Sequence, residues 1–128
     1  MPLPVLRLII WVSNHEKINY IELPARNLEA SKHLFSEVFG WSFTDYGPDY
    51  TAFSNAGIEG GFYQADRQAQ YSQGSALVVL YSDNLEQTLD KIQKAGGKIT
   101  QPIFSFPGGR RFHFSEPSGN ELGVWSAQ

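Results

Sequence analysis

Two carboxylates and one histidine stand among apolar and aromatic residues, where ionisable side chains are uncommon. Glu22 interrupts an apolar stretch, Glu121 precedes another, and His113 lies between two phenylalanines. Carboxylates and imidazoles are the usual general acids and bases of enzymes, and partial burial moves their pKa values toward those roles. Glu22 and Glu121 are therefore candidate catalytic bases, and His113 is a candidate pH-sensitive group in a ligand site.

Each of these groups also has a structural interpretation. Glu121 follows a turn and can be a solvated or paired acid, and His113 can be a hydrogen-bonded packing residue. Glu22 can form an ion pair with one of three arginines: Arg26, Arg110 and Arg111. The two remaining histidines, His15 and His33, are expected at the surface, and the three histidines show no metal-ligand spacing.

The neighbours of these groups can be assigned to one surface, because residues two apart in a strand point to the same face. A cleft is predicted with aromatic, acidic and basic lining side chains: Tyr20, Glu22, Glu59, Tyr81, Arg111, His113, Glu121 and Trp125. Mostly apolar walls with a few polar groups suit a flat organic ligand. Three glycines are expected to leave room for that ligand: Gly60, Gly61 and Gly123.

The elements that would position these residues are written twice in the chain. Asn27 followed by Leu and Glu matches Asn84 followed by the same two residues, and the same spacing aligns Gly40 with Gly97. The asparagines are expected to cap the N-termini of two helices, and Gln87 completes a capping-box pattern in the second copy. The glycines are expected to end the helices in the left-handed conformation.

Each copy predicts one strand, one helix and three further strands. Runs rich in β-branched and aromatic residues, bounded by turn formers, place strands at residues 18–23, 41–45, 50–55, 58–63, 77–81, 98–104, 111–115 and 121–126. This order predicts an α+β fold in which two tandem βαβββ units form a curled mixed sheet with a cleft. Residues 17–128 are expected to form one domain, with units at 17–63 and 75–127 and a linker at 64–74. Residues 1–16 are interpreted as an N-terminal appendage, or else as an added edge strand or dimer contact.

The composition narrows the classes of partner and chemistry. The chain has 128 residues, a formal charge of -3 and no cysteine. These values exclude a disulfide framework, a thiolate nucleophile and a zinc site with sulfur ligands, and they give no basic patch for nucleic acid. The apolar stretch at 5–12 is much shorter than the roughly 20 residues of a membrane-spanning helix. We expect a cytoplasmic protein that binds neither nucleic acid nor membrane.

Three motifs on this repeat carry a resemblance to a known family. They are Leu28-Glu29-Ala30-Ser31, Phe39-Gly40-Trp41 and Glu116-Pro117-Ser118-Gly119-Asn120. A duplicated unit with these motifs resembles the glyoxalase/bleomycin-resistance/extradiol dioxygenase (vicinal oxygen chelate) superfamily, in its branch related to lactoylglutathione lyase. The resemblance covers residues 18–127, and it implies two curled sheets that form a cleft, commonly in a homodimer. The motif at 116–120 is interpreted as a structural turn before the last strand.

The resemblance also implies where a divalent ion would be held in metal-using relatives. The corresponding positions here are Tyr20, Leu77 and Gly123, with the fourth falling on either Glu59 or Gly61. Leu77 and Gly123 offer no ligand atom, whereas a tight divalent site needs about three or more protein ligands. No metal and no cofactor is therefore predicted, with a divalent metal held by relocated ligands as the alternative.

Three functional hypotheses remain open at the level of the sequence. The first is a small-molecule-binding protein that holds an aromatic or flat organic ligand without the family metal. The second is an enzyme, either a glyoxalase-like lyase or isomerase that uses Glu22 or Glu121 as base, or a metal enzyme with relocated ligands. The third is a dimeric interaction module whose cleft is vestigial.

Overall fold

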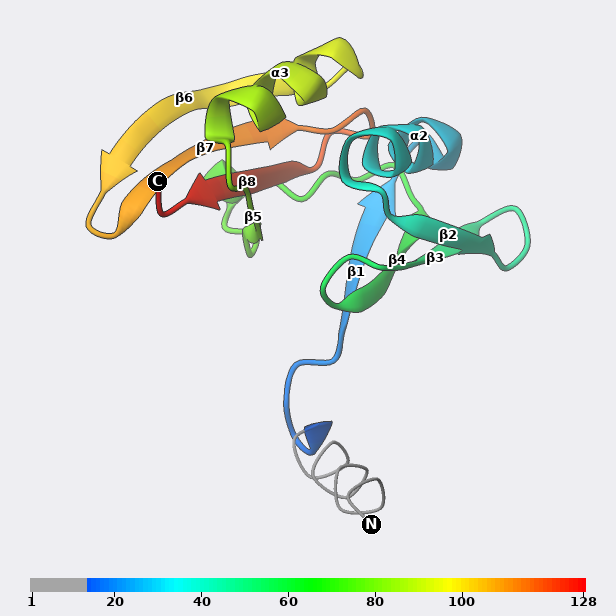
Figure 1. Cartoon of the computed structure of the whole chain (residues 1–128). Coiled ribbons are helices and arrows are strands. Elements are labelled where there is room, and N and C mark those ends of the chain that lie inside the picture. The colour runs from blue at the N-terminus through cyan, green and yellow to red at the C-terminus, as the bar shows by residue number, and fades with distance from the viewer. Residues whose placement is uncertain (1–13) are drawn as a thin grey trace.

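Two similar units, each with one helix on a four-stranded mixed sheet, make up the computed structural model, which describes residues 14–128 (Figure 1). The first unit contains β1 (Tyr20–Ala25), α2 (Leu28–Phe39), β2 (Ser42–Asp45), β3 (Tyr50–Ser54) and β4 (Glu59–Gln64). The second contains β5 (Val78–Tyr81), α3 (Leu85–Lys94), β6 (Lys98–Phe106), β7 (Gly109–Ser115) and β8 (Glu121–Ser126). A short 3-10 helix, η1 (Tyr71–Gln73), lies in the linker between the units.

The two sheets have the same topology. Their strand orders are β1-β4-β3-β2 and β5-β8-β7-β6. In each, the first strand runs parallel to the last, and the remaining pairs are antiparallel. The predicted α+β fold of two βαβββ units is therefore confirmed, with hydrogen bonding dividing the strands into two sheets. Of the predicted appendage at 1–16, residues 1–13 lie outside the described part of the chain.

The helix ends follow the sequence signals in part. Asn27 accepts a hydrogen bond from the backbone N–H of Ala30, and Asn84 accepts one from that of Gln87, as expected of N-caps. The reciprocal capping-box bond is absent at Asn84, because its own N–H donates to the Ser82 hydroxyl. The prediction that Gly97 ends α3 in the left-handed conformation is also wrong.

The two helices end in different ways. Gly40 closes α2 with φ 71°, as predicted, whereas the left-handed residue after α3 is Gly96, with φ 99°. Gly97 has another role, since a Cβ there would lie 3.2 Å from the carbonyl oxygen of Ile92 and 3.3 Å from Leu34 Cδ1. This glycine permits the chain to pass close to both helices.

One aromatic core joins the two units. The Phe35 ring stacks on Trp41 with centroids 4.5 Å apart and lies 6.4 Å from the ring of Phe114, which comes from the second unit. Phe39 contacts Phe114 as well, at 6.2 Å. Both units thus bury their helix-facing sides in a shared core, and the opposite faces of the sheets remain available for a ligand. Neither helix in the span 14–128 has the length and apolar character needed to cross a membrane.

The buried side chain of Glu116, in the second unit, forms a hydrogen bond to the first unit. Glu116 is 2% exposed, and its oxygens accept hydrogen bonds from the Ser31 hydroxyl, the Ser118 N–H and the Asn120 N–H and side-chain amide. Asn120 also donates to the carbonyl of Pro24 at 2.6 Å. Burial raises the pKa of Glu116, and these hydrogen bonds offset part of that effect. The structural interpretation of the turn at 116–120 agrees with these contacts.

Candidate ligand-binding site

A pocket of about 640 Å³ lies on the face of the second sheet that points away from α3. Strands β6, β7 and β8 form its floor, and η1 forms one wall. Its lining combines aromatic rings with polar and ionisable groups: Gln70, Tyr71, Ser72, Thr100, Gln101, Phe104, Arg111, His113 and Glu121. Three residues of the predicted cleft, Arg111, His113 and Glu121, thus meet in one pocket.

His113 and Glu121 form an oriented pair at the floor of this pocket. His113 is 3% exposed, and its Nδ1 lies 2.9 Å from Glu121 Oε2. An ionised carboxylate can only accept, so Nδ1 carries the proton of this bond, and in the neutral form of the ring Nε2 is an acceptor. Nε2 is buried and has no partner among the described residues. The pair therefore has the arrangement of an oriented base, with an imidazole positioned by a carboxylate.

Glu121 is held in place by more than the contact to His113. Besides His113, it accepts from the Tyr71 backbone N–H at 3.3 Å, and the Thr100 hydroxyl approaches it at 3.5 Å. The contact to Tyr71 anchors η1 at the pocket, and the Tyr71 ring meets the His113 ring edge-on at 5.3 Å. These contacts make Glu121 a positioning group, so the imidazole is the better placed base of the two.

Arg111 contributes a positive charge that no acid in the described chain neutralises. Its guanidinium carbon lies 5.2 Å from the centre of the Phe104 ring and 5.9 Å from that of Phe106. Its Nε is buried without a hydrogen-bond partner. The adjacent Arg110 points to the other face of β7 and pairs with Glu86 at 2.6 Å. Two consecutive arginines therefore have opposite environments.

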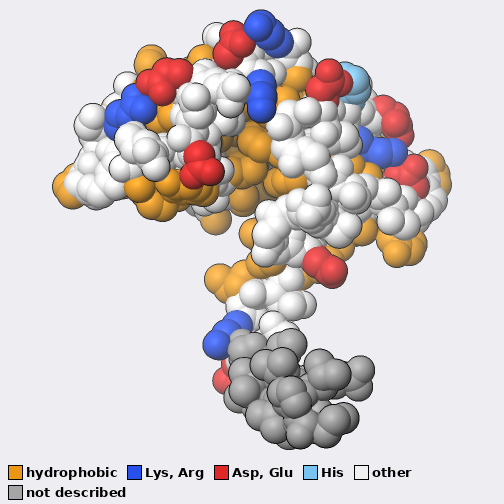
Figure 2. All heavy atoms as spheres, in the orientation of Figure 1, with side chains coloured by type: hydrophobic (Ala, Val, Ile, Leu, Met, Phe, Trp, Pro, Cys, Tyr) orange, Lys and Arg blue, Asp and Glu red, His pale blue; other side chains and the backbone are white. Residues whose placement is uncertain are grey.

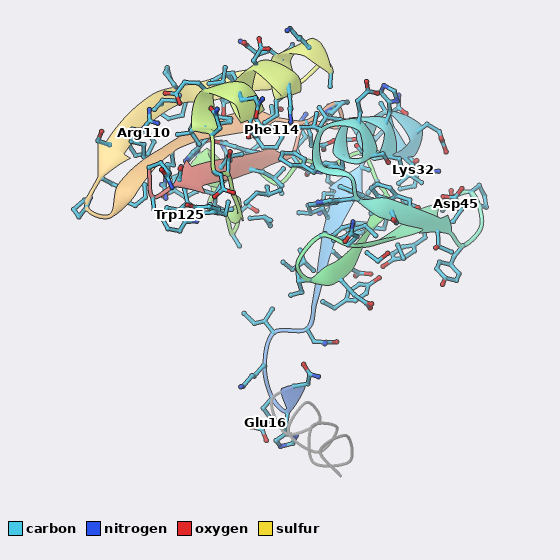
Figure 3. All side chains as sticks on the ribbon, viewed as in Figure 1. Glu16, Lys32, Asp45, Arg110, Phe114 and Trp125 are labelled. Carbon is cyan, nitrogen blue, oxygen red and sulfur yellow. The ribbon has the colours of Figure 1, made fainter. Side chains whose placement is uncertain are left out.

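Tyr81 and Trp125 extend the aromatic surface beyond the pocket. Their rings meet edge-on at 4.9 Å, and the Phe106 ring lies 6.2 Å from that of Trp125. Figure 3 shows Trp125 on β8, on the second unit. Figure 2 shows hydrophobic side chains along the lower edge of the part formed by β5–β8. Together with Arg111, His113 and Glu121, these two residues bring to five the number of predicted lining residues that lie on the second sheet.

The other three predicted residues lie on the first sheet, outside the pocket. Tyr20 and Glu59 are partners across β1 and β4. The Tyr50 hydroxyl donates to Glu22 Oε2 at 2.9 Å and shares a hydrogen bond with the Tyr20 hydroxyl. Burial, reinforced by these two neighbours, raises the pKa of Tyr50. The eight residues therefore form two groups and not one cleft lining within a single chain.

The expected environment of Glu22 is wrong in two respects. Its side chain is exposed, so the burial that would favour a general base is missing. Its hydrogen-bond partner is Tyr50, and the ion pair with an arginine does not form. Arg26 pairs instead with Asp66 at 2.8 Å. The surface positions expected for the other histidines are confirmed, since His33 pairs with Glu37 and His15 lies beside Glu16 with both rings exposed.

The glycines do not open the space that the sequence suggested. The position of a Cβ on Gly61 is filled by the Tyr50 side chain, and that on Gly60 by the Phe53 ring and the carbonyl of Ile21. At Gly123 a Cβ would meet Leu77 at 3.3 Å and Val79 at 3.5 Å. Gly61 thus lets Tyr50 cross the sheet toward Glu22, and close packing explains these positions better than ligand access.

Two lining residues of the pocket are placed by irregular pairing of β6 and were missed in the sequence. The register shifts between Ile99 and Gln101 and again between Gln101 and Phe104, which sets Gln101 opposite His113 and Phe104 opposite Arg111. Strict alternation cannot put residues three apart on one face, but a bulge can. Pro102 within the strand was the one available signal, since proline marks edges and bulges.

Tyr50 and Tyr71 were missed for different reasons. Tyr71 lies in the polar linker, where a sequence pattern gives no side-chain direction, although an aromatic residue in a polar run is a signal in itself. Tyr50 lies on the same strand face as Gly61, since its neighbour Ala52 pairs with that glycine. Its reach to Glu22 depends on strand pairing that sequence alone does not supply.

The positions implied for a divalent ion do not fit one. Tyr20 is committed to the Tyr50 hydroxyl, Leu77 packs beside Gly123, and Glu59 is exposed. Across the described span 14–128, no three His, Asp or Glu side chains gather closely enough to hold a metal ion. Within this span, only one pair of ionisable side chains, His113 and Glu121, has a buried atom that could bind a metal and lacks a hydrogen-bond partner. Two groups fall short of the usual ligand number.

The same architecture occurs in solved structures of other proteins. A glyoxalase-related enzyme from Fulvimarina pelagi superimposes with a TM-score of 0.72 at 19% identity, covering 87% of this chain and 88% of that chain. A fosfomycin resistance protein, FosX, from Listeria monocytogenes also gives 0.72, at 14% identity, covering 86% and 89%. These identities show the shared fold alone.

Sequence comparison extends the likeness to CFP32 of Mycobacterium tuberculosis. It is 22% identical over 117 residues, which are 85% of this chain but 45% of CFP32. The chain thus spans about half the length of that relative. The family model described as Glyoxalase/Bleomycin resistance protein/Dioxygenase superfamily matches residues 17–124, which is most of the chain. The protein therefore belongs to the glyoxalase/bleomycin resistance protein/dioxygenase superfamily.

Proposed function

We propose that the protein binds a flat organic molecule in the pocket over β6–β8, without a metal ion. The observation that carries this proposal is the buried His113 Nε2, which lacks a partner at the floor of a pocket walled by Tyr71 and Phe104. An unpartnered buried polar atom is costly, so native sites that keep one commonly use it for a ligand or water. A ligand hydroxyl or N–H donor would satisfy it.

Aromatic walls supply the nonspecific part of the binding energy. A planar ligand that loses about 100 Å² of apolar surface between two rings gains roughly 2.5 kcal/mol. Ring pairs in offset or edge-on contact add about 0.5–1.5 kcal/mol. The continuing rings of Phe106, Trp125 and Tyr81 would accommodate a ligand larger than one ring system.

An enzymatic role is the second candidate, and the orientation of His113 favours it over a role for Glu22. A neutral imidazole whose Nδ1–H is held by a carboxylate can take a proton at Nε2. A lyase or isomerase of this kind would move a proton between His113 and an acidic carbon or oxygen of the ligand. Loss of turnover with retained binding in His113→Gln would separate catalysis from binding alone.

We also propose a homodimer in the cytoplasm. Several large apolar side chains are exposed in the single chain: Ile18, Tyr20, Tyr63, Val79 and Tyr81. A second apolar hollow of about 760 Å³ runs between β1 and β5 and is lined by Ile18, Val79 and Tyr81 among others. If this surface serves only for association, the third hypothesis, an interaction module, applies. Val79→Glu should then shift the sedimentation of the protein from dimer to monomer.

The experiment that tests the binding proposal is a thermal-shift screen with planar aromatic probes such as naphthols and quinones. A ligand that binds only the folded state must raise the apparent melting temperature. The shift should disappear in Tyr71→Ala and Phe104→Ala. It should persist in the control Tyr46→Ala, which removes a ring that is 66% exposed on the first unit. An equal shift in all three variants, or none in the wild type, contradicts the proposed pocket.

A further inference from the structure

The two opposite charges of the pocket, Glu121 and Arg111, are not paired with each other. Glu121 is its only acid, and that carboxylate already receives the His113 Nδ1–H and the Tyr71 backbone N–H. Arg111 is its only permanent cation and has no hydrogen bond or ion pair to any residue in the described span 14–128. The acid thus already accepts two hydrogen bonds from its neighbours, whereas the donors of the cation are available to a ligand.

The position of Arg111 is fixed although its charge is unpaired. Its guanidinium lies over Phe104 and near Phe106, and its Cα partners across the sheet are Phe104 and Trp125. Stacking on aromatic faces holds a guanidinium in one plane without using its N–H donors. The donors are therefore preorganised for an acceptor that the protein does not supply.

A planar guanidinium binds a carboxylate through two parallel hydrogen bonds, and the stacked rings beside it suit a flat carbon skeleton. A doubly charged phosphate matches less well, because a single arginine would neutralise half of its charge while Glu121 stands in the same pocket. We propose that the pocket selects an aromatic carboxylate, whose carboxylate pairs with Arg111 and whose ring lies beside Tyr71 and Phe104. This inference rests on the proposed function and adds the chemical class of the ligand.

The two arginines of β7 provide a matched test. Calorimetric titrations would use 2-naphthoate and its neutral counterpart 2-naphthalenemethanol on the full chain, with 2-naphthyl phosphate as a third probe. Charged hydrogen bonds contribute about 1.5–3 kcal/mol, so 2-naphthoate should bind roughly tenfold or more tightly than the alcohol. Arg111→Gln should remove that preference, so that the acid and the alcohol bind this variant within about twofold of each other. Arg110→Gln, which removes the neighbour that pairs with Glu86 on the opposite face of β7, should leave the preference intact.

The results of these titrations distinguish a failure of the aromatic-carboxylate proposal from a failure of the binding proposal. Equal binding of the acid and the alcohol, unchanged in Arg111→Gln, overturns the inference and leaves the pocket as a binder of flat molecules. Binding of neither probe overturns both. Tighter binding of the phosphate overturns the choice of carboxylate. If Arg111→Gln fails to fold, Arg111→Lys provides the test. Lysine keeps the positive charge but cannot form the bidentate hydrogen bonds, so this variant should retain only part of the preference for the acid.

Discussion

Adding one methyl group at Gly61 should destabilise the protein far more than adding one at Gly123, although both glycines lie inside strands. A Cβ on Gly61 would overlap the Tyr50 hydroxyl, come within 2.5 Å of its ring carbon Cζ and lie 2.9 Å from the carbonyl oxygen of Thr51. Tyr50 must then leave its place and give up its hydrogen bond to Glu22. At Gly123 the nearest atoms are side-chain methyls at 3.3 and 3.5 Å, which can move.

The expected magnitudes follow from these contacts. Overpacking costs about 1–3 kcal/mol, and the lost Tyr50 hydrogen bond about 1 kcal/mol more. Replacing glycine by alanine returns roughly 0.4–1 kcal/mol through the unfolded chain. Gly61→Ala should therefore lower the free energy of unfolding by about 2–3 kcal/mol, and Gly123→Ala should stay within about 1 kcal/mol of wild type.

Urea unfolding followed by tryptophan fluorescence measures both variants. The slope with denaturant should not change, so the midpoint alone should move. In a Tyr50→Ser background the penalty of Gly61→Ala should shrink, because the two positions are in direct conflict and their effects are coupled. A Gly61→Ala protein as stable as wild type, or an equal loss from Gly123→Ala, would refute the reasoning.

Three further outcomes are expected. Asn84→Ala removes the cap of α3 and should cost about 1 kcal/mol of unfolding free energy in urea titrations, while a value near zero would deny the cap its role. Glu121→Ala leaves the His113 Nδ1–H and Tyr71 N–H without an acceptor, so a loss of about 1–3 kcal/mol and faster amide exchange at Tyr71 should be observed. The pKa of Glu116 is raised in the folded state, so the folded protein keeps this proton to a higher pH than the unfolded chain does. The contribution of this group to the free energy of unfolding is therefore fully present at low pH, and it is lost as the pH rises through the folded pKa. Glu116→Gln should remove that component from a pH series of unfolding measurements, and an unchanged pH profile would contradict it.

The parts of the fold that depend on local pattern were readable from the sequence. Strand alternation, the asparagine caps and the glycine after α2 each arise from interactions within a few residues. Even here the second copy departs from the first, because α3 ends earlier and uses Gly96 for the left-handed position. A repeat thus predicted the order of elements better than their ends.

The site required information that local pattern does not carry. Arg111 and His113 could be placed on one face by alternation, but the bulges of β6 decide that Gln101 and Phe104 face them. Tyr71 reaches the pocket through the linker and a backbone bond to Glu121, 50 residues later in the chain. Glu22 was placed on the correct strand, yet its partner Tyr50 and its exposure depend on how β3 pairs with β4.

The proposed ligand lies against His113, on the face of the second sheet that points away from α3. Isotope-filtered nuclear Overhauser spectra of the labelled protein with a planar probe found in the screen would locate that ligand directly. Contacts from the probe to ring protons of Tyr71, Phe104 and His113 are the result expected. Contacts confined to Ile21, Leu80 and their neighbours in the apolar hollow between β1 and β5 would contradict it.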